Sequence, residues 1–142
     1  FRLAIHCNSS RAEAEALAAD LCAQGHPPPL VVQADLDDPA VADRLFDQLP
    51  RPPRLLVNNA SLFVEDALGT VGPELWHRHM GVNLLAPVLL MQAFAARMAQ
   101  GATGLVVNLS DAKLSSPNPD FFSYTLSKMG LAGATELAAR KL

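Results

Sequence analysis

Residues 55–61, Leu55-Leu56-Val57-Asn58-Asn59-Ala60-Ser61, form a short apolar run that ends in polar residues. Pro50, Pro52 and Pro53 precede this run and end any helix that approaches it. An uninterrupted apolar run bounded in this way is typical of a strand that is buried on both faces of a sheet. Three further runs of the same kind are predicted as strands, at 1–6, 30–34 and 104–109.

Helix-forming stretches separate these predicted strands. Helices are expected over about 10–24, 40–49, 73–100 and 121–142. Ser9 or Ser10 suits the N-cap of the first helix, and Pro87 is expected to kink the third. Alternating strands and helices predict an α/β fold: a Rossmann-like, doubly wound parallel sheet with helices on both faces. We expect residues 1–142 to form a single dinucleotide-binding domain.

Composition narrows the possible partners. The chain has 142 residues, 50% of them hydrophobic, and a formal net charge of −3. Its 11 lysines and arginines are scattered, which argues against a nucleic-acid partner. Cys7 and Cys22 form neither a disulfide framework nor a metal-ligand spacing, as is typical of the reducing cytoplasm. The apolar stretches are interrupted too often to span a bilayer. We therefore expect a cytoplasmic protein with no membrane partner and no metal.

Two histidines flank Arg78 and raise the question of a metal site. His77 and His79 are two positions apart on a predicted helix, so they point to different faces and cannot chelate one ion together. We expect both side chains to be solvated.

Tyr124 and Lys128 are four residues apart at the start of the last predicted helix. This spacing places both side chains on one helix face. A free phenol has a pKa of about 10 and is a poor acid or base at neutral pH. A neighbouring ammonium group favours the phenolate, so we expect Lys128 to lower the pKa of Tyr124 toward the working range.

Together with the Asn58-Asn59-Ala60 turn, Asn83 in a long apolar helix and the strand that ends near Asp111, this pair resembles the short-chain dehydrogenase/reductase superfamily. The resemblance extends over essentially the whole chain. Members of that family begin with a further strand and a glycine-rich turn, and in the sheet this strand lies between the strands matching 1–6 and 55–58. They also continue beyond the match to residue 142. No such turn occurs in this sequence, so we expect the middle portion of the fold, incomplete at both ends.

The resemblance implies a catalytic set of Asp111, Tyr124, Lys128 and Asn83. In the family, the asparagine holds a water that relays protons to the lysine, although a buried amide can also be a satisfied core residue. Asp111 lies thirteen positions before Tyr124, where most of the family has serine. An ionised aspartate only accepts hydrogen bonds and would repel a developing oxyanion, so it suits a substrate that presents N–H groups. The alternative is that Ser110 takes the usual serine's role, but its side chain is expected to point to the other side.

The same Asp, Tyr and Lys pattern is found in the pteridine-reductase and dihydromonapterin-reductase branch. In that branch, an aromatic residue two positions after the serine of this turn stacks on the pterin ring. In this chain the turn is Asn59-Ala60-Ser61, and the aromatic residue is Phe63. The implied substrate-binding residues are therefore Ser61, Phe63, Asp111 and Tyr124. Phe63 alone would more often be a core residue.

Cofactor choice depends on the end of the first strand. An acid there would accept from the ribose hydroxyl and exclude a 2′-phosphate, but no acid occurs between this strand and Glu13. This favours NADPH. The cofactor-binding residues implied by the resemblance are His6, Asn8, Ser9, Ser10, Asp35, Leu36, Asn59, Ala60, Ser61, Tyr124 and Lys128.

The sequence thus predicts an NADPH-dependent short-chain reductase that acts on a small molecule, a dihydropterin or dihydrofolate. One alternative is the same enzyme type acting on a carbonyl or alcohol. Another is a non-catalytic cofactor-binding scaffold, against which the intact Tyr124 and Lys128 argue. The resemblance also implies a homo-oligomer, a tetramer built by the two long helices.

Overall fold

A computed structural model describes residues 1–141 of the chain and divides it into two compact units. Unit 1 is Phe1–Arg51 and unit 2 begins at Pro52. The expectation of a single domain stays a prediction.

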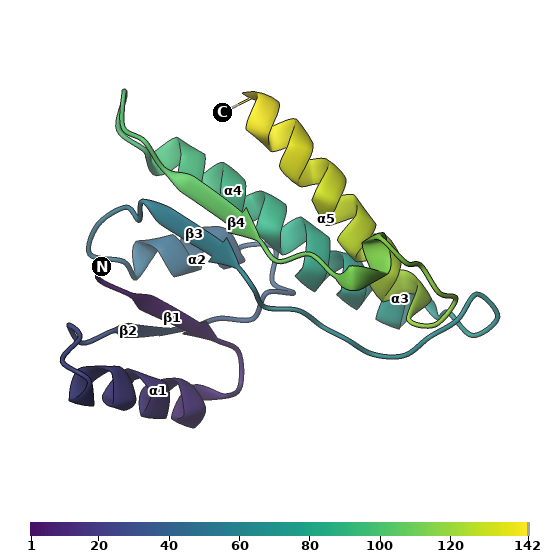
Figure 1. Cartoon of the computed structure of the whole chain (residues 1–142), viewed down its shortest axis with the longest axis horizontal. Helices are drawn as coiled ribbons and strands as arrows, with labels where there is room; N and C mark the ends of the chain where they lie inside the picture. The colour runs from purple at the N-terminus through teal and green to yellow at the C-terminus, as the bar shows by residue number, and fades with distance from the viewer. Residues whose placement is uncertain (142) are drawn as a thin grey trace. The chain divides into compact units, whose positions relative to one another are not determined.

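Unit 1 is a parallel strand pair with two helices. Strand β1 (Ala4–Cys7) pairs with β2 (Leu30–Gln33) in parallel, from Ala4 opposite Leu30 to Cys7 opposite Gln33. Helix α1 (Arg11–Ala23) connects the two strands and contacts both, as the purple part of Figure 1 shows. Helix α2 (Val41–Asp47) follows β2 and buries four of its seven residues. The parallel pairing requires a crossover connection, which α1 provides.

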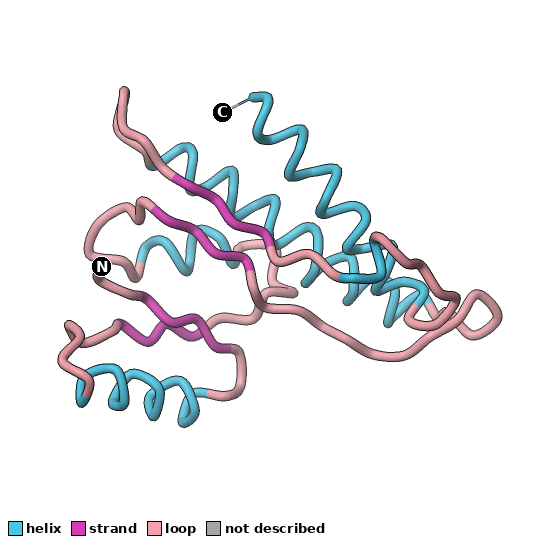
Figure 2. The backbone as a smooth tube through the Cα atoms, viewed as in Figure 1, coloured by secondary structure: helices cyan, strands magenta, loops and turns pink. Residues whose placement is uncertain are grey.

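Unit 2 contains a second parallel pair, β3 (Leu55–Asn58) and β4 (Leu105–Asn108), whose strands run side by side in Figure 2. Between them lie α3 (Pro73–Met80), a π-helical turn (Gly81–Leu85) and α4 (Ala86–Arg97). A short 3-10 turn (Ala112–Leu114) and α5 (Phe122–Lys141) follow β4. Helix α4 contacts β3, α5 contacts β4, and the two helices also contact each other.

Close packing between α4 and β4 explains one glycine. A Cβ atom on Gly104, just before β4, would lie 2.7 Å from the ring of Phe94, which is buried on α4. A larger residue there would require the Phe94 side chain to shift. The opposite face of this strand pair exposes apolar side chains, among them Leu55, Val57 and Leu105.

The predicted order of strands and helices is confirmed, and the observed bounds differ from the predicted ones by a few residues at most. In the described residues, β1 and β3 belong to separate two-stranded sheets. Pro87 lies at the start of α4, after the π-helical turn. Since Pro87 has no N–H to give to the carbonyl of Asn83, the ordinary helical bond is lost there.

The expectation about apolar stretches needs a correction. Pro73–Arg97 is one continuous helical segment that is long and apolar enough to span a membrane by length and composition. It includes the polar side chains of His79 and Asn83, which are fully buried within the protein. We therefore interpret it as a core helix.

Candidate active site

Tyr124 and Asp111 form the centre of the candidate site in unit 2. The phenol of Tyr124, on the first turn of α5, donates a hydrogen bond of 2.6 Å to Oδ2 of Asp111. Asp111 caps the 3-10 turn after β4, where its Oδ1 accepts the backbone N–H of Lys113 at 2.8 Å. The end of β4 and the start of α5 therefore bring together two residues of the catalytic set that the family resemblance implies.

Tyr124 is a protonated donor in this arrangement. Burial, the hydrogen bond to Asp111 and the negative charge of Asp111 raise the pKa of Tyr124 to about 12, although a hydrogen bond with Ser61 opposes the change. The same hydrogen bond, followed by the one from the Lys113 N–H, lowers the pKa of Asp111 below its ordinary value. At neutral pH the proton of the pair lies on the phenol and the carboxylate is the acceptor.

The expected lowering of the Tyr124 pKa by Lys128 is therefore wrong for this structure. The spacing of four does place the lysine close by, with its Nζ atom 5.9 Å from the Tyr124 ring centroid. However, Nζ donates instead to the backbone carbonyl of Leu109 at 3.0 Å. Burial also lowers the pKa of the Lys128 ammonium, while Asp111 opposes this change. Desolvation and Asp111 dominate at the phenol, and both favour its neutral form.

Asn83 is fully buried in the π-helical turn and holds the loop after β3. Its Oδ1 accepts the N–H of Leu62 at 2.7 Å, and its Nδ2 donates to the carbonyl of Leu62 at 2.9 Å. Nδ2 also donates to Ser127 at 3.1 Å, and the Ser61 hydroxyl lies 3.3 Å from Oδ1. Asn83 thus positions Ser61 beside Tyr124, and its expected part in a water relay stays a prediction.

Phe63 lies against Tyr124 as an open aromatic surface. Its ring meets the Tyr124 ring edge-on, with centroids 4.6 Å apart, and stacks in parallel on Phe121 at 4.0 Å. Phe121 adopts a positive φ of 56°, which is unfavourable for an aromatic residue. Because Phe63 is 54% exposed, it is not the core residue that an isolated phenylalanine usually is.

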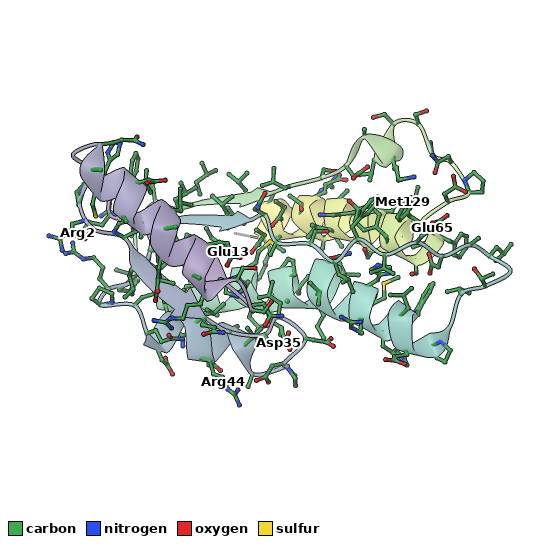
Figure 3. The ribbon with its side chains drawn as sticks, turned by 90° about the horizontal axis from the view of Figure 1, so that it is seen from below. Arg2, Glu13, Asp35, Arg44, Glu65 and Met129 are labelled. Carbon is green, nitrogen blue, oxygen red and sulfur yellow. The ribbon has the colours of Figure 1, made fainter. Side chains whose placement is uncertain are left out.

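Unit 1 gathers most of the other residues implied as cofactor ligands at the carboxyl ends of its two strands. His6 Nε2 contacts the carbonyl of Ala34 at 2.9 Å, and the Asn8 amide lies 3.5 Å from Asp35, which Figure 3 labels. Gln33 was not predicted, yet its side chain donates to the carbonyl of Asn8 at 2.6 Å and fixes the turn. The sequence signal for Gln33 was its place at the end of a predicted strand.

The remaining implied cofactor ligands are accessible. Ser9 and Ser10 are exposed, and Ser10 occupies the N-cap position of α1 without a side-chain capping bond. Leu36 is half-buried in the turn after β2, and Asn59 and Ala60 are exposed after β3. Whether these residues bind a cofactor stays a prediction.

The structure also contains a buried polar cluster that the sequence did not predict. His79, expected to be solvated, is completely buried, and its Nδ1 lies 2.6 Å from the Ser123 hydroxyl. Ser123 in turn donates to Asp66. His77 is exposed, as expected, whereas His79 is buried, so the two histidines do lie on different faces. No group of three potential metal-ligating side chains occurs among residues 1–141.

Comparisons with known proteins show the family of the chain. The short chain dehydrogenase family matches the chain over residues 1–142. The (3R)-3-hydroxyacyl-CoA dehydrogenase of Rattus norvegicus is 34% identical over 78% of this chain and 44% of its own length. Pteridine reductase 1 of Leishmania tarentolae is 30% identical, over 100% of this chain and 63% of its own. The chain therefore spans about half the length of the curated relatives it matches.

Solved structures give a higher similarity. FolM alternative dihydrofolate reductase 1 from Brucella suis, crystallised in complex with NADP, is 44% identical with a TM-score of 0.89. The match covers 100% of this chain and 60% of that protein. The reductase LugOII, which catalyses keto-reduction in lugdunomycin biosynthesis, is 26% identical with a TM-score of 0.88 over 99% of this chain and 61% of its own.

Proposed function

Because the chain belongs to the short-chain dehydrogenase family, we propose that it is part of an NADPH-dependent oxidoreductase that reduces a dihydropterin or dihydrofolate. The observation that carries this proposal is the hydrogen bond from Tyr124 to an ionised Asp111, beneath the exposed ring of Phe63. The Brucella and Leishmania relatives named above support the pteridine branch.

The residues at the end of β1 fit a phosphorylated cofactor. Asn8, Ser9 and Ser10 present exposed amide and hydroxyl donors there, and phosphate oxygens accept hydrogen bonds from such groups. In the family, the lysine that matches Lys128 holds the nicotinamide ribose. In this chain the Lys128 ammonium lies at the end of β4. NADPH would supply a hydride when bound.

Three side chains of unit 2 have separate roles in the proposed reaction. Reduction of a ring C=N bond adds a hydride to carbon and a proton to nitrogen. Tyr124 carries the available proton, because its pKa of about 12 keeps the phenol neutral. Asp111, ionised and acceptor-only, would accept N–H groups of the pterin ring and so orient it. Phe121 stacks on one face of the Phe63 ring, and the exposure of Phe63 leaves the other face for an aromatic substrate ring.

Reduction of an ordinary carbonyl is the second candidate, because relatives with hydroxyacyl-CoA dehydrogenase and keto-reductase names also match. Asp111 argues against it. A carbonyl oxygen that gains negative charge would meet a carboxylate, whereas catalysis favours donors at that position.

The substrate class can be tested at Asp111 in the full-length protein. We expect the wild type to oxidise NADPH with dihydropterin or dihydrofolate and to be slow with a panel of ketones. Asp111→Ser introduces the residue most relatives have, so it should sharply reduce pterin turnover and preserve or raise ketone turnover. A wild type that consumes NADPH with ketones and ignores pterins would overturn the proposed substrate. Failure with both substrate classes would favour the scaffold alternative.

A further inference from the structure

We propose that His79, oriented by Ser123 and Asp66, is a positioning residue that holds Phe63 in place for substrate stacking. The inference rests on the proposed function, because it assigns Phe63 to the substrate. None of the three buried side chains hydrogen-bonds to the Tyr124 phenol or to Asp111, and the hydrogen bond from the Val64 N–H to His79 connects the cluster to the loop that carries Phe63.

The hydrogen bonds of the cluster fix where every proton lies. Ser123 has one hydroxyl proton and donates it to the carboxylate of Asp66, which also accepts the backbone N–H of Ser123 at 3.0 Å. The Ser123 oxygen must therefore accept from His79 Nδ1, 2.6 Å away. With its proton on Nδ1, a neutral His79 has an unprotonated Nε2, and this atom lies 3.3 Å from the N–H of Val64. One tautomer of His79 satisfies all of these contacts.

This tautomer links helix α5 to the residue that follows Phe63. Val64 is held by His79, and Leu62 on the other side of Phe63 is held through both its N–H and its carbonyl by Asn83. His79 and Asn83 are four positions apart on the same helical segment, so they present a matched pair of anchors. Phe63 itself is exposed between two fixed neighbours. Its orientation over Tyr124 is thereby set before a substrate arrives.

The same three residue types form the triad of serine hydrolases, but the arrangement here excludes that chemistry. In a triad the histidine lies between serine and aspartate and accepts the serine proton. Here Ser123 lies between His79 and Asp66 and donates to the acid. Ser123 and His79 are also completely buried, so no substrate reaches the hydroxyl.

Protonation of His79 would break the anchor, because a protonated Nε2 cannot accept the N–H of Val64. Burial lowers the pKa of His79, Asp66 opposes this change, and Arg78 adds to it. The ring of Tyr124, 6.1 Å away, also faces the imidazole but remains neutral. The anchor is therefore formed at neutral pH and would be lost in acid.

Three full-length variants test the proposal. His79→Leu removes the acceptor for Val64, His79→Gln retains an acceptor at a similar distance, and His77→Leu is a control outside the cluster. His79→Leu removes both hydrogen bonds of the imidazole, but only the one to Val64 reaches the loop that carries Phe63. We therefore expect it to raise the KM for dihydropterin roughly 2- to 10-fold with a smaller change in kcat. His79→Gln should restore most of the wild-type KM, and His77→Leu should leave it unchanged.

Amide hydrogen exchange supplies a readout that does not depend on turnover. The N–H of Val64 should be protected in the wild type, unprotected in His79→Leu and protected again in His79→Gln. Unchanged protection in a folded His79→Leu, or nitrogen chemical shifts that place the proton on Nε2, would overturn the anchor. If Val64 behaves as expected but no variant reduces pterins, the proposed function fails while the anchor stands. If pterin reduction is normal and its KM is unaffected by His79→Leu, the positioning role fails alone.

Discussion

Ser123 and Tyr124 are neighbours on the first turn of α5, yet their side chains belong to hydrogen-bond networks of opposite character. Ser123 is completely buried, and its hydroxyl accepts from His79 and donates to Asp66. The Tyr124 phenol donates to Asp111. Asp111 is only half-buried, so its carboxylate can accept a hydrogen bond from a substrate in place of the phenol. The closed network can hold the backbone in place, whereas the open one can transfer a proton. A single helical turn thus supplies both a fixed support and a reactive group.

The largest difference between the two networks should appear in the rate. Tyr124→Phe keeps the ring but removes the phenol proton that we assign to the substrate, so we expect kcat to fall about 10²- to 10⁴-fold. NADPH binding, measured by titration, should be nearly unchanged. Ser123→Ala is the matched variant in the closed network and should leave most of kcat intact. If the kcat of Tyr124→Phe were within a few-fold of the wild-type value, Tyr124 would be a structural residue and the two networks would not differ in function.

The titration of Tyr124 offers a second measurement. Tyr124 is the one tyrosine in residues 1–142, so tyrosinate absorbance of this chain reports it alone. We expect a midpoint near 12 rather than the ordinary value of about 10, and a lower midpoint in Asp111→Asn. The folded pKa is raised, so the stabilisation is complete below the unfolded value of about 10 and is lost as the pH rises through 12. A midpoint near or below 10 would restore the expectation that Lys128 promotes the phenolate.

A smaller effect is expected at the aromatic surface between the networks. Phe63→Ala removes a stacking face worth about 0.5–1.5 kcal/mol beyond its buried area, so the KM for dihydropterin should rise several-fold. Because Phe63 transfers no proton, kcat should change less. Leu68→Ala is a control in the same loop, since Leu68 is 75% exposed. Equal effects of the two substitutions would remove the stacking role.

The sequence predicted features that depend on local pattern. Residues 55–58 were predicted as a strand with the observed bounds. The family resemblance placed Asp111 and Tyr124 in one catalytic set, and the two side chains are hydrogen-bonded. The failures all involve a distant partner. Lys128 lies near Tyr124, but the carbonyl of Leu109 takes its ammonium. His79 beside Arg78 appeared solvent-facing because its burial depends on Asp66 and Ser123, which are distant in sequence.

The smallest predicted effect concerns stability in acid and isolates the closed network. The pKa of His79 is lowered by folding, so the unfolded chain binds a proton more readily than the folded one. This contribution is present above the unfolded pKa of about 6.5 and is lost as the pH falls below it. The free energy of unfolding, measured by urea denaturation, should therefore decrease from neutral to mildly acidic pH. His79→Gln cannot titrate and should show a shallower decrease, whereas His77→Leu should follow the wild type. Identical slopes for wild type and His79→Gln would mean that the buried imidazole is not neutral in the folded protein, and the anchor at Val64 would lose its physical basis.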